Sequence, residues 1–282
     1  MKYKKIDTKL FVKNRKNFVN KLEQKSIAFF NSNDIYPISA DSTLPFDQHR
    51  DIFYLSGIDQ EESILVLFPD SKNMSYKEML FIRETNEHIT HWEGEKLTKE
   101  QAKKISGINN VYWLGEFDDI LRDVLKKVDF VYINTNEHYR QNVQTQTRED
   151  RFIKKLKKIG GLNFKKSNPI LQKQRSIKDN IEIQLIKTAC EITKIGFERV
   201  LKFIKPGVWE YEIEAEFSHE FLKNRSRKFA YTPIIASGRN SNFLHYIYNN
   251  KQCLDGEIVL MDVAAEYANY SSDMTRTVPV NG

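Results

Sequence analysis

The sequence predicts a mixed α/β (α+β) protein built from two successive domains. First, apolar runs of strand length alternate with amphipathic helical segments through the first half, a pattern typical of a layered α/β domain. Second, a proline-containing stretch over 167–175 precedes a long helical pattern. Third, the 282 residues are 40% apolar and 12% aromatic, which suffices for one large or two moderate cores and excludes a mainly disordered chain. We therefore expect domains over 1–172 and 173–282.

In the first domain, the spacing of apolar residues predicts three helices and four strands. The helices are expected over 11–24, 97–105 and 117–128, and the strands over 26–31, 63–68, 78–82 and 130–133. A further apolar run over 51–55 leads into a turn at Ser56-Gly57.

The second domain is expected to begin with two helices and to continue with strands. Ser176 is a suitable N-cap, Asp179 occupies the capping-box position, and an apolar stripe follows until the Pro206-Gly207 pair ends the helix. A second helix over 210–223 opens with acidic residues that suit the positive end of its dipole. Strand-like segments follow over 231–236, 243–248, 257–266 and 270–279.

Charge and apolar content limit the expected partners. No apolar run approaches the ~20 residues of a spanning helix, and the basic N-terminus lacks the apolar core of a secretion signal. Cys190 and Cys253 form no disulfide or metal motif, so we expect a cytoplasmic protein without a membrane partner. The net charge is +6, and the run 151–166 holds seven basic residues and no acidic one. A solvated helix face explains this run better than a nucleic-acid surface, because no aromatic platform accompanies it.

The strongest local signal is the predicted hairpin over 257–279, which carries Asp262 and Asp273. A two-residue loop at 267–268 would place these two aspartates opposite each other. A loop at 268–269 would instead pair Asp262 with Thr275 and leave the aspartates as diagonal neighbours on one face. Only a loop of odd length would separate them.

Two carboxylates on one face of this hairpin need a partner. At about 5 Å they repel by about 3 kcal/mol at an effective dielectric near 20. A divalent cation fits two oxygen ligands of this kind. The alternatives are a hairpin with two exposed acids, or Arg276 as their counter-ion.

His245 lies in the aromatic and apolar run NFLHYIY. A single histidine in such a setting is more often a hydrogen-bonded core residue than a catalytic one, although its flanks also suit the wall of a pocket. The sequence contains no nucleophile elbow, zincin, P-loop or dinucleotide-binding glycine pattern, so these chemistries have no support.

These residues lie in segments that resemble Xaa-Pro aminopeptidases (aminopeptidase P), which belong to the creatinase/prolidase group of "pita-bread" metallopeptidases. The resemblance covers nearly the whole chain and implies a creatinase-like N-terminal α/β domain followed by the first half of a pita-bread catalytic domain. The matching segments are RSIKDNIEIQLIKTACEIT, KPGVWEYEIEAEFSHEF, ASGRNSNFLHY and GEIVLMDVAAEYANYSSDMTRTVPVNG, preceded by LPFDQHRDIFYLSGIDQEESILVLF and THWEG.

The resemblance implies a role for each candidate residue. Asp262 matches the first aspartate ligand of a centre of two divalent metal ions, usually manganese, and Asp273 matches the aspartate that bridges both ions. His245 matches a histidine on the substrate side, which holds the peptide and assists proton movement. Trp92 would line the substrate pocket of a neighbouring subunit in a homo-oligomer, or else be a half-exposed structural residue. The implied reaction releases the first residue of peptides with proline in second position.

The chain departs from the family pattern in two ways. The remaining ligands of the family, one histidine and two glutamates from the second half of the catalytic domain, have no match within 1–282. Ala264 replaces a glycine that usually stands two residues after the first aspartate. We therefore expect this chain to be an incomplete, inactive portion of such an enzyme. A prolidase-type dipeptidase and a non-catalytic pita-bread module that binds peptides or proteins remain as alternatives.

Overall fold

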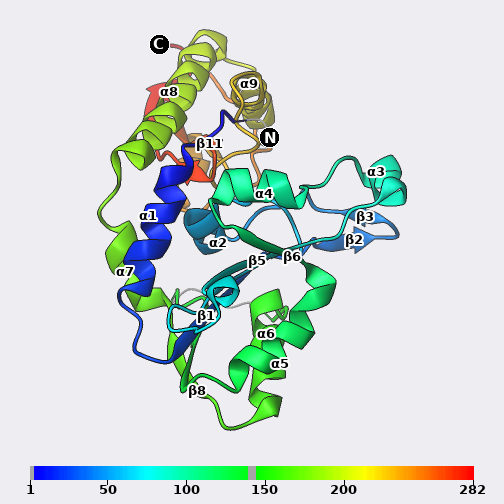
Figure 1. The fold of residues 1–282 in the computed structure, drawn as a ribbon. Coiled ribbons are helices and arrows are strands. Elements are labelled where there is room, and N and C mark those ends of the chain that lie inside the picture. The colour runs from blue at the N-terminus through cyan, green and yellow to red at the C-terminus, as the bar shows by residue number, and fades with distance from the viewer. Residues whose placement is uncertain (1–2, 139–143) are drawn as a thin grey trace. The chain divides into compact units, whose positions relative to one another are not determined.

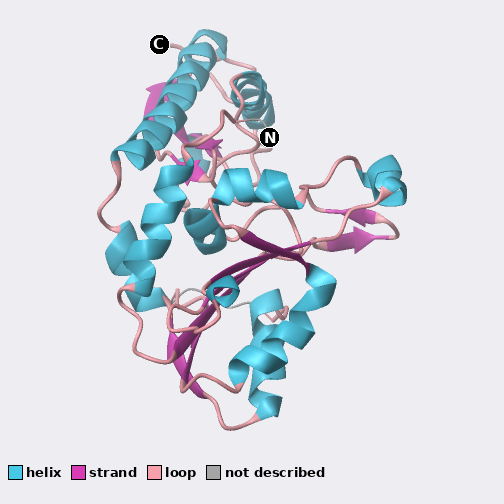
Figure 2. Ribbon diagram, in the orientation of Figure 1, coloured by secondary structure: helices cyan, strands magenta, loops and turns pink. Residues whose placement is uncertain are grey.

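The computed structural model describes residues 3–138 and 144–282, which form two compact units (Figures 1 and 2). One unit comprises Ile6–Ile177. The other comprises Lys178–Gly282 together with the N-terminal segment that ends at Lys5. The units divide slightly beyond the expected join, and the domain limits of 1–172 and 173–282 stay a prediction.

The first unit is built on a six-stranded mixed sheet in the order β6-β5-β4-β1-β7-β8. Strands β1, β7 and β8 are parallel, as are β5 and β6, whereas β4 runs antiparallel to both of its neighbours. The strands are β1 (Ser26–Asn31), β4 (Ile64–Leu67), β5 (Glu78–Ile82), β6 (Asn110–Trp113), β7 (Phe130–Ile133) and β8 (Asn163–Lys166). All four strands predicted for this domain are confirmed, whereas β6 and β8 were not predicted.

Helices cover both faces of this sheet. Because successive residues of a strand point to opposite faces, Ile27 and Phe29 of β1 contact one helical layer, and Ala28 and Phe30 contact the other. One layer contains α5 (Phe117–Leu125) and α6 (Arg148–Ile159), and the other contains α1 (Thr8–Val19), α2 (Arg50–Ser56), α4 (Lys99–Ser106) and α7 (Asn168–Arg175) (Figure 1). This is the layered α/β domain that the sequence predicts.

A small hairpin and a short helix lie outside this layered core. The hairpin consists of β2 (Pro37–Ser39) and β3 (Ser42–Thr43), and the helix is α3 (Glu87–Glu93). All residues of β2 and β3 are exposed, and α3 contains no buried residue. Neither element was predicted.

Arg15 ties three helices of this unit together. The side chain is fully buried, and its Nη1 donates to the backbone oxygens of Leu55 and Ser106 at 2.8 and 2.9 Å. These carbonyls lie at the C-terminal ends of α2 and α4, where the helix dipole is negative and carbonyls lack partners within the helix. Glu78 of β5 completes the pairing at 3.1 Å from Nε. These partners offset only part of the cost of burying the guanidinium, because burial still lowers the pKa of Arg15.

The segment 167–175 differs from the expected join. It forms α7, with Pro169 in the first turn, where the missing N–H costs nothing. The long helix α8 (Asn180–Phe203) starts later than predicted, because Asp179 rather than Ser176 is the N-cap and forms a capping box with Glu182. Ser176 is instead the C-cap of α7.

The basic run 151–166 lies on α6 and β8, and four of its seven cations pair with nearby acids. Arg151 contacts Asp34 at 2.7 Å and Lys155 contacts Asp118 at 2.5 Å. Lys165 pairs with Glu23, and Lys166 pairs with Glu137. This local neutralisation favours the solvated helix face that we expected.

The second unit packs two helices against a three-stranded antiparallel sheet. Helix α8 contacts α9 (Glu210–Lys223), whose predicted bounds are confirmed, at Gly196. A Cβ on Gly196 would lie 2.8 Å from Phe221 and 2.9 Å from Phe217, so only glycine permits this close approach. The sheet has the order β13-β10-β9, with β9 (Ile234–Ser237), β10 (Ile258–Asp262) and β13 (Thr275–Pro279). Within the described parts of both units, no helix combines the length and apolarity needed to span a bilayer.

Glu149 is a partly buried residue at the start of α6. It accepts hydrogen bonds from Asn31 Nδ2 at 2.7 Å and from the backbone N–H of Asn134 at 3.2 Å. Both bonds favour the ionised form, but burial outweighs them and raises the pKa of Glu149 from 4.5 to about 7. The carboxyl therefore connects the ends of β1 and β7 to α6. Ionising it in the folded protein costs free energy, and this cost is present only at a pH where the group loses its proton.

This cost predicts a pH-dependent stability. Between pH 4.5 and about 7 the folded chain keeps a proton on Glu149 that the unfolded chain releases, so stability falls as pH rises through this window. The fall should be at most about 3 kcal/mol. In urea unfolding from pH 5 to 8, the free energy of unfolding of Glu149→Gln should fall less with pH than that of the unchanged chain. Glu100→Gln, at an exposed glutamate, should keep the original slope.

Candidate functional site

The site is set by a tight turn between β11 (Glu266–Tyr267) and β12 (Tyr270–Ser271). Ala268 and Asn269 both adopt the left-handed conformation, with φ of 53° and 65°, as two-residue hairpin turns require. The backbone N–H of Asn269 donates to the buried carboxylate of Glu266 at 2.8 Å, which stabilises the turn. The loop therefore occupies 268–269, the second of the two predicted positions.

This turn fixes the register of the whole hairpin. Asp262 pairs with Thr275, and the pairing continues without a shift to Glu266 and Ser271. Because the loop has an even length, Asp273 lies two residues from Thr275 on the same face as Asp262. The prediction that both carboxylates share one face is confirmed.

Tyr231 connects the two carboxylates. Its hydroxyl oxygen lies 2.5 Å from Asp262 Oδ1 and 3.1 Å from Asp273 Oδ1. The single proton of a phenol can be donated to only one of them at a time. Burial, together with both aspartates, raises the pKa of Tyr231 strongly, so the hydroxyl remains protonated. The arrangement brings three oxygen atoms together and leaves the second carboxylate without this donor.

The two aspartates differ in exposure and support. Asp262 is half-buried at the end of β10, whereas Asp273 is exposed. Behind Asp273, the hydroxyls of Ser272 and Thr193 lie 2.7 Å apart, and Thr193 also accepts the N–H of Ala265 at 2.9 Å. These bonds connect α8 to both strands of the hairpin and hold the backbone of Asp273.

Arg276 is not the counter-ion of the aspartates. Side chains alternate along the strand, so Arg276 points to the opposite face from Asp273 and Thr275. Its Nη1 donates to the backbone oxygen of Thr275 at 2.8 Å, and among the described residues it forms no ion pair with either aspartate. This alternative from the sequence is wrong.

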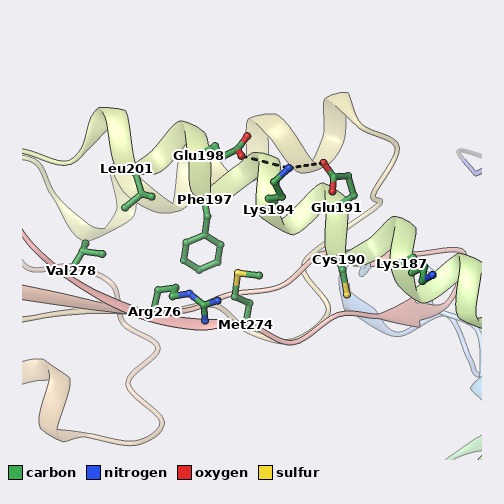
Figure 3. A pocket seen from close by; sticks show the side chains of 10 residues that line it. All are labelled: Lys187, Cys190, Glu191, Lys194, Phe197, Glu198, Leu201, Met274, Arg276 and Val278. Atoms are coloured by element: carbon green, nitrogen blue, oxygen red, sulfur yellow. Dashed lines mark hydrogen bonds and ion pairs between the residues drawn. The ribbon is translucent and has the colours of Figure 1, made fainter.

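Arg276 lines a groove of about 700 Å³ between α8 and β13 (Figure 3). Phe197, Leu201, Met274 and Val278 supply much of its apolar lining. Figure 3 shows Lys194 on α8, joined to Glu191 and Glu198. The groove lies on the face of the hairpin opposite to the aspartates, so it is separate from the carboxylate site.

His245 lies in a turn and is exposed, so the predicted strand over 243–248 is wrong. The neighbouring Phe243 and Leu244 are also exposed, and the segment has no adjacent strand to pair with in the described chain. Tyr246, however, packs against Leu260 of β10, which shares a face with Asp262. The loop carrying His245 thus covers the open face of the sheet on which the aspartates lie.

The structure does not join all four candidate residues. No hydrogen bond or ion pair connects His245 to Asp262 or Asp273 within the described ranges. Trp92 belongs to the other compact unit, in α3, and 74% of its surface is exposed. Its neighbours in contact are the rings of His88 and His91.

The carboxylates supply part of a metal site. Carboxylate oxygens on a shared face are suitable ligands for a hard divalent ion. In residues 3–138 and 144–282, however, no three or more His, Cys, Asp or Glu side chains cluster in a way that could hold a metal. The described residues fit two ligands of such a centre and not a complete one.

Two polar residues near the site were not singled out from the sequence. The sequence predicts only a strand at Tyr231, and nothing in its spacing indicates contact with aspartates 31 and 42 residues away. For Glu210 the sequence predicts a partner of the dipole at the start of a helix. It is instead fully buried and accepts hydrogen bonds from the segment around His245.

Comparison with known proteins agrees with this arrangement. The family model for the aminopeptidase P N-terminal domain matches residues 11–132, and that for metallopeptidase family M24 matches residues 184–282. The chain is 30% identical to Xaa-Pro aminopeptidase of Escherichia coli over 98% of its own length and 63% of the relative's. It is also 30% identical to human Xaa-Pro aminopeptidase 3, over 89% of this chain and 50% of the relative.

Solved structures give the same result. Aminopeptidase PepP of Pseudomonas aeruginosa superposes with a TM-score of 0.88 at 27% identity, over 98% of this chain and 63% of that one. E. coli aminopeptidase P with the inhibitor Pro-Leu gives a TM-score of 0.87 at 28% identity, with coverage of 99% and 63%. Other E. coli structures contain substrate, or product with substituted zinc. The chain thus spans less than two thirds of the length of these relatives.

The Tyr231 contact predicts a measurable contribution to stability. Tyr231→Phe removes the hydroxyl and leaves Asp262 without this donor, which should lower the free energy of unfolding by about 1 kcal/mol at pH 7. Urea unfolding measures this difference. Tyr211→Phe, at a half-exposed tyrosine of the same unit, should have little effect.

Proposed function

Because the chain belongs to the aminopeptidase P group of metallopeptidase family M24, we propose that it provides the N-terminal domain and two metal ligands of an Xaa-Pro aminopeptidase. The observation that carries this proposal is the meeting of Asp262 and Asp273 at the hydroxyl of Tyr231, on the open face of the second unit. The substrates would be peptides with proline in second position, from which the first residue is released. The E. coli neighbours that hold substrate and Pro-Leu support this substrate class.

Each candidate residue of this chain would have its own role in the reaction. Asp262 would bind one of two divalent ions, manganese by family resemblance, and Asp273 would bridge both. Bound there, the ions would lower the pKa of a water and polarise the scissile carbonyl. Tyr231 would hold the orientation of the two carboxylates through its hydrogen bond. His245, on the loop over the same face, would hold the peptide and transfer a proton.

Two carboxylates alone form a weak and open site. We therefore propose that residues 1–282 by themselves do not catalyse the reaction. In that state the chain would resemble a pita-bread module that binds peptides without cleaving them. The described residues contain no cluster of three or more possible metal ligands, which favours this alternative for residues 1–282. A prolidase-type activity on dipeptides is the nearest enzymatic alternative.

Two further assignments remain proposals. The limits 1–172 and 173–282 describe the N-terminal domain and the partial catalytic domain. A cytoplasmic location is consistent with Cys190 and Cys253, both of which are free thiols.

Metal binding tests the two-carboxylate site. Calorimetric titration of the 1–282 chain with manganese should give millimolar affinity, and Asp262→Asn/Asp273→Asn should abolish it. Glu191→Gln/Glu198→Gln, on the opposite side of the hairpin, is the matched control and should leave the binding unchanged. Micromolar, stoichiometric binding that the double Asn variant loses would contradict the proposal, because it would require a completed ligand set.

Activity tests the proposed substrate class and the inactivity of this chain. Residues 1–282 should release no detectable first residue from Xaa-Pro peptides in the presence of manganese. A longer form of the protein that contains the missing ligands should release it, and Asp262→Asn in that form should reduce the rate by at least about a thousandfold. Cleavage by 1–282 at the rate of the longer form would contradict the proposal.

Trp92 tests the proposed contribution of the N-terminal domain. In a catalytically active assembly, Trp92→Ala should raise KM for Xaa-Pro peptides several-fold while kcat changes less, because an aromatic side chain that only contacts substrate contributes uniform binding. Steady-state kinetics measure both values. An unchanged KM would leave Trp92 as an exposed structural residue.

A further inference from the structure

The loop that carries His245 has little hydrophobic packing. Phe243, Leu244, Ile247 and Tyr248 expose between 51% and 91% of their surfaces, whereas Tyr246 is buried and clusters with side chains of β9. Apolar side chains that remain in solvent contribute no burial energy to the conformation of a loop. The packing of Tyr246 alone therefore does not explain where His245 lies.

Hydrogen bonds to one buried carboxylate restrain both ends of the segment, in addition to the bonds that Asn249 makes near its end. Glu210 is the first residue of α9 and is fully buried. Its Oε1 accepts the N–H of Ser237 at 2.7 Å and the hydroxyl of Ser237 at 2.8 Å, and Asn240 Nδ2 lies 3.4 Å away. This oxygen fixes the segment as it leaves β9.

The other oxygen fixes the same segment where it returns. Glu210 Oε2 accepts the hydroxyl of Tyr246 at 2.7 Å and the N–H of Lys251 at 2.9 Å. The backbone N–H of Glu210 also donates to the carbonyl of Lys251 at 3.0 Å. Burial and Glu210 raise the pKa of the Tyr246 phenol, so it remains a donor. One residue thus binds both ends of the 237–251 segment.

Among the described residues Glu210 forms no ion pair, so these hydrogen-bond donors compensate its charge. A buried carboxylate needs hydrogen bonds to both oxygens, and a rearranged loop would remove them. Hydrogen bonds to ionised groups are also stronger than those between neutral groups. The buried charge therefore favours the one loop conformation that directs all of these donors at it.

We propose that Glu210 is a positioning residue, whose carboxylate clamps both ends of the 237–251 segment and so determines the place of His245. The functional meaning of the clamp rests on the proposed role of His245 in binding peptide. The clamp itself does not, because it is a property of the loop in the absence of any ligand.

The test compares Glu210→Gln with Glu216→Gln in the 1–282 chain. Both changes lie on α9, but Glu216 pairs with Arg199 and does not contact the loop. Hydrogen–deuterium exchange of 237–251 should accelerate at least about tenfold in Glu210→Gln, because amide N–H groups lose a charged acceptor. The imidazole NMR signal of His245, assigned with His245→Asn, should shift or broaden. Glu216→Gln should change neither.

A folded Glu210→Gln variant with unchanged loop exchange and an unchanged His245 signal would overturn the proposal. If Glu210→Gln does not fold, Tyr246→Phe decides, since it removes one hydroxyl and keeps the ring. Its expected effect is an approximately threefold to tenfold faster exchange over 246–251, with a displaced His245 signal. The control is Tyr248→Phe, at an exposed tyrosine, and equal behaviour of the two variants would also overturn the proposal.

These measurements separate the clamp from the proposed function. Neither metal nor peptide is present in them, so a failed manganese or peptidase experiment leaves the clamp intact. Conversely, if Glu210→Gln leaves the loop unchanged, the clamp proposal is wrong and the peptidase proposal is unaffected.

Discussion

The arrangement of the second unit depends on the two left-handed residues at the tip of its hairpin. Ala268 and Asn269 make the loop two residues long, and this even number keeps Asp262 and Asp273 on one face. A loop one residue longer would turn one carboxylate toward α8 and the groove. An alanine with φ of 53° is unfavourable in isolation, and the bond from Asn269 to buried Glu266 helps to hold the turn. The hydrogen bond that the buried carboxylate of Glu266 accepts from the N–H of Asn269 thus offsets local backbone strain, and the candidate site follows from the resulting register.

The features that the sequence predicts well are those set by local pattern. The continuous apolar runs of β1, β4, β5 and β7 predict these four strands of the first domain, as expected for strands covered by helices on both faces. The bounds of α9 and the shared face of the two aspartates depend only on spacing along a short stretch. Such features need no knowledge of distant contacts.

The features that the sequence does not predict are set by tertiary contacts. The run over 243–248 is rich in aromatic and β-branched residues and therefore looks like a strand, but Glu210 draws its ends together and leaves it outside the sheet. Tyr231 reaches the aspartates only because β9 lies beside β10. In the segment 167–175, Pro169 before a long helical pattern favours a join between domains, although proline also suits a first helical turn. In each case the local signal has two interpretations, and the fold selects one of them.

The clamp at Glu210 has a consequence for how this part of the protein can evolve. Ser237, Tyr246 and the backbone N–H of Lys251 hold the ends of the loop through their hydrogen bonds to Glu210. The exposed side chains at 243, 244, 247 and 248 therefore contribute little to stability. Mutations at these four positions can accumulate at small thermodynamic cost, while a change at Glu210 disturbs all of them at once. The loop therefore combines four exposed side chains that can change at little cost with one buried residue whose change alters the whole segment.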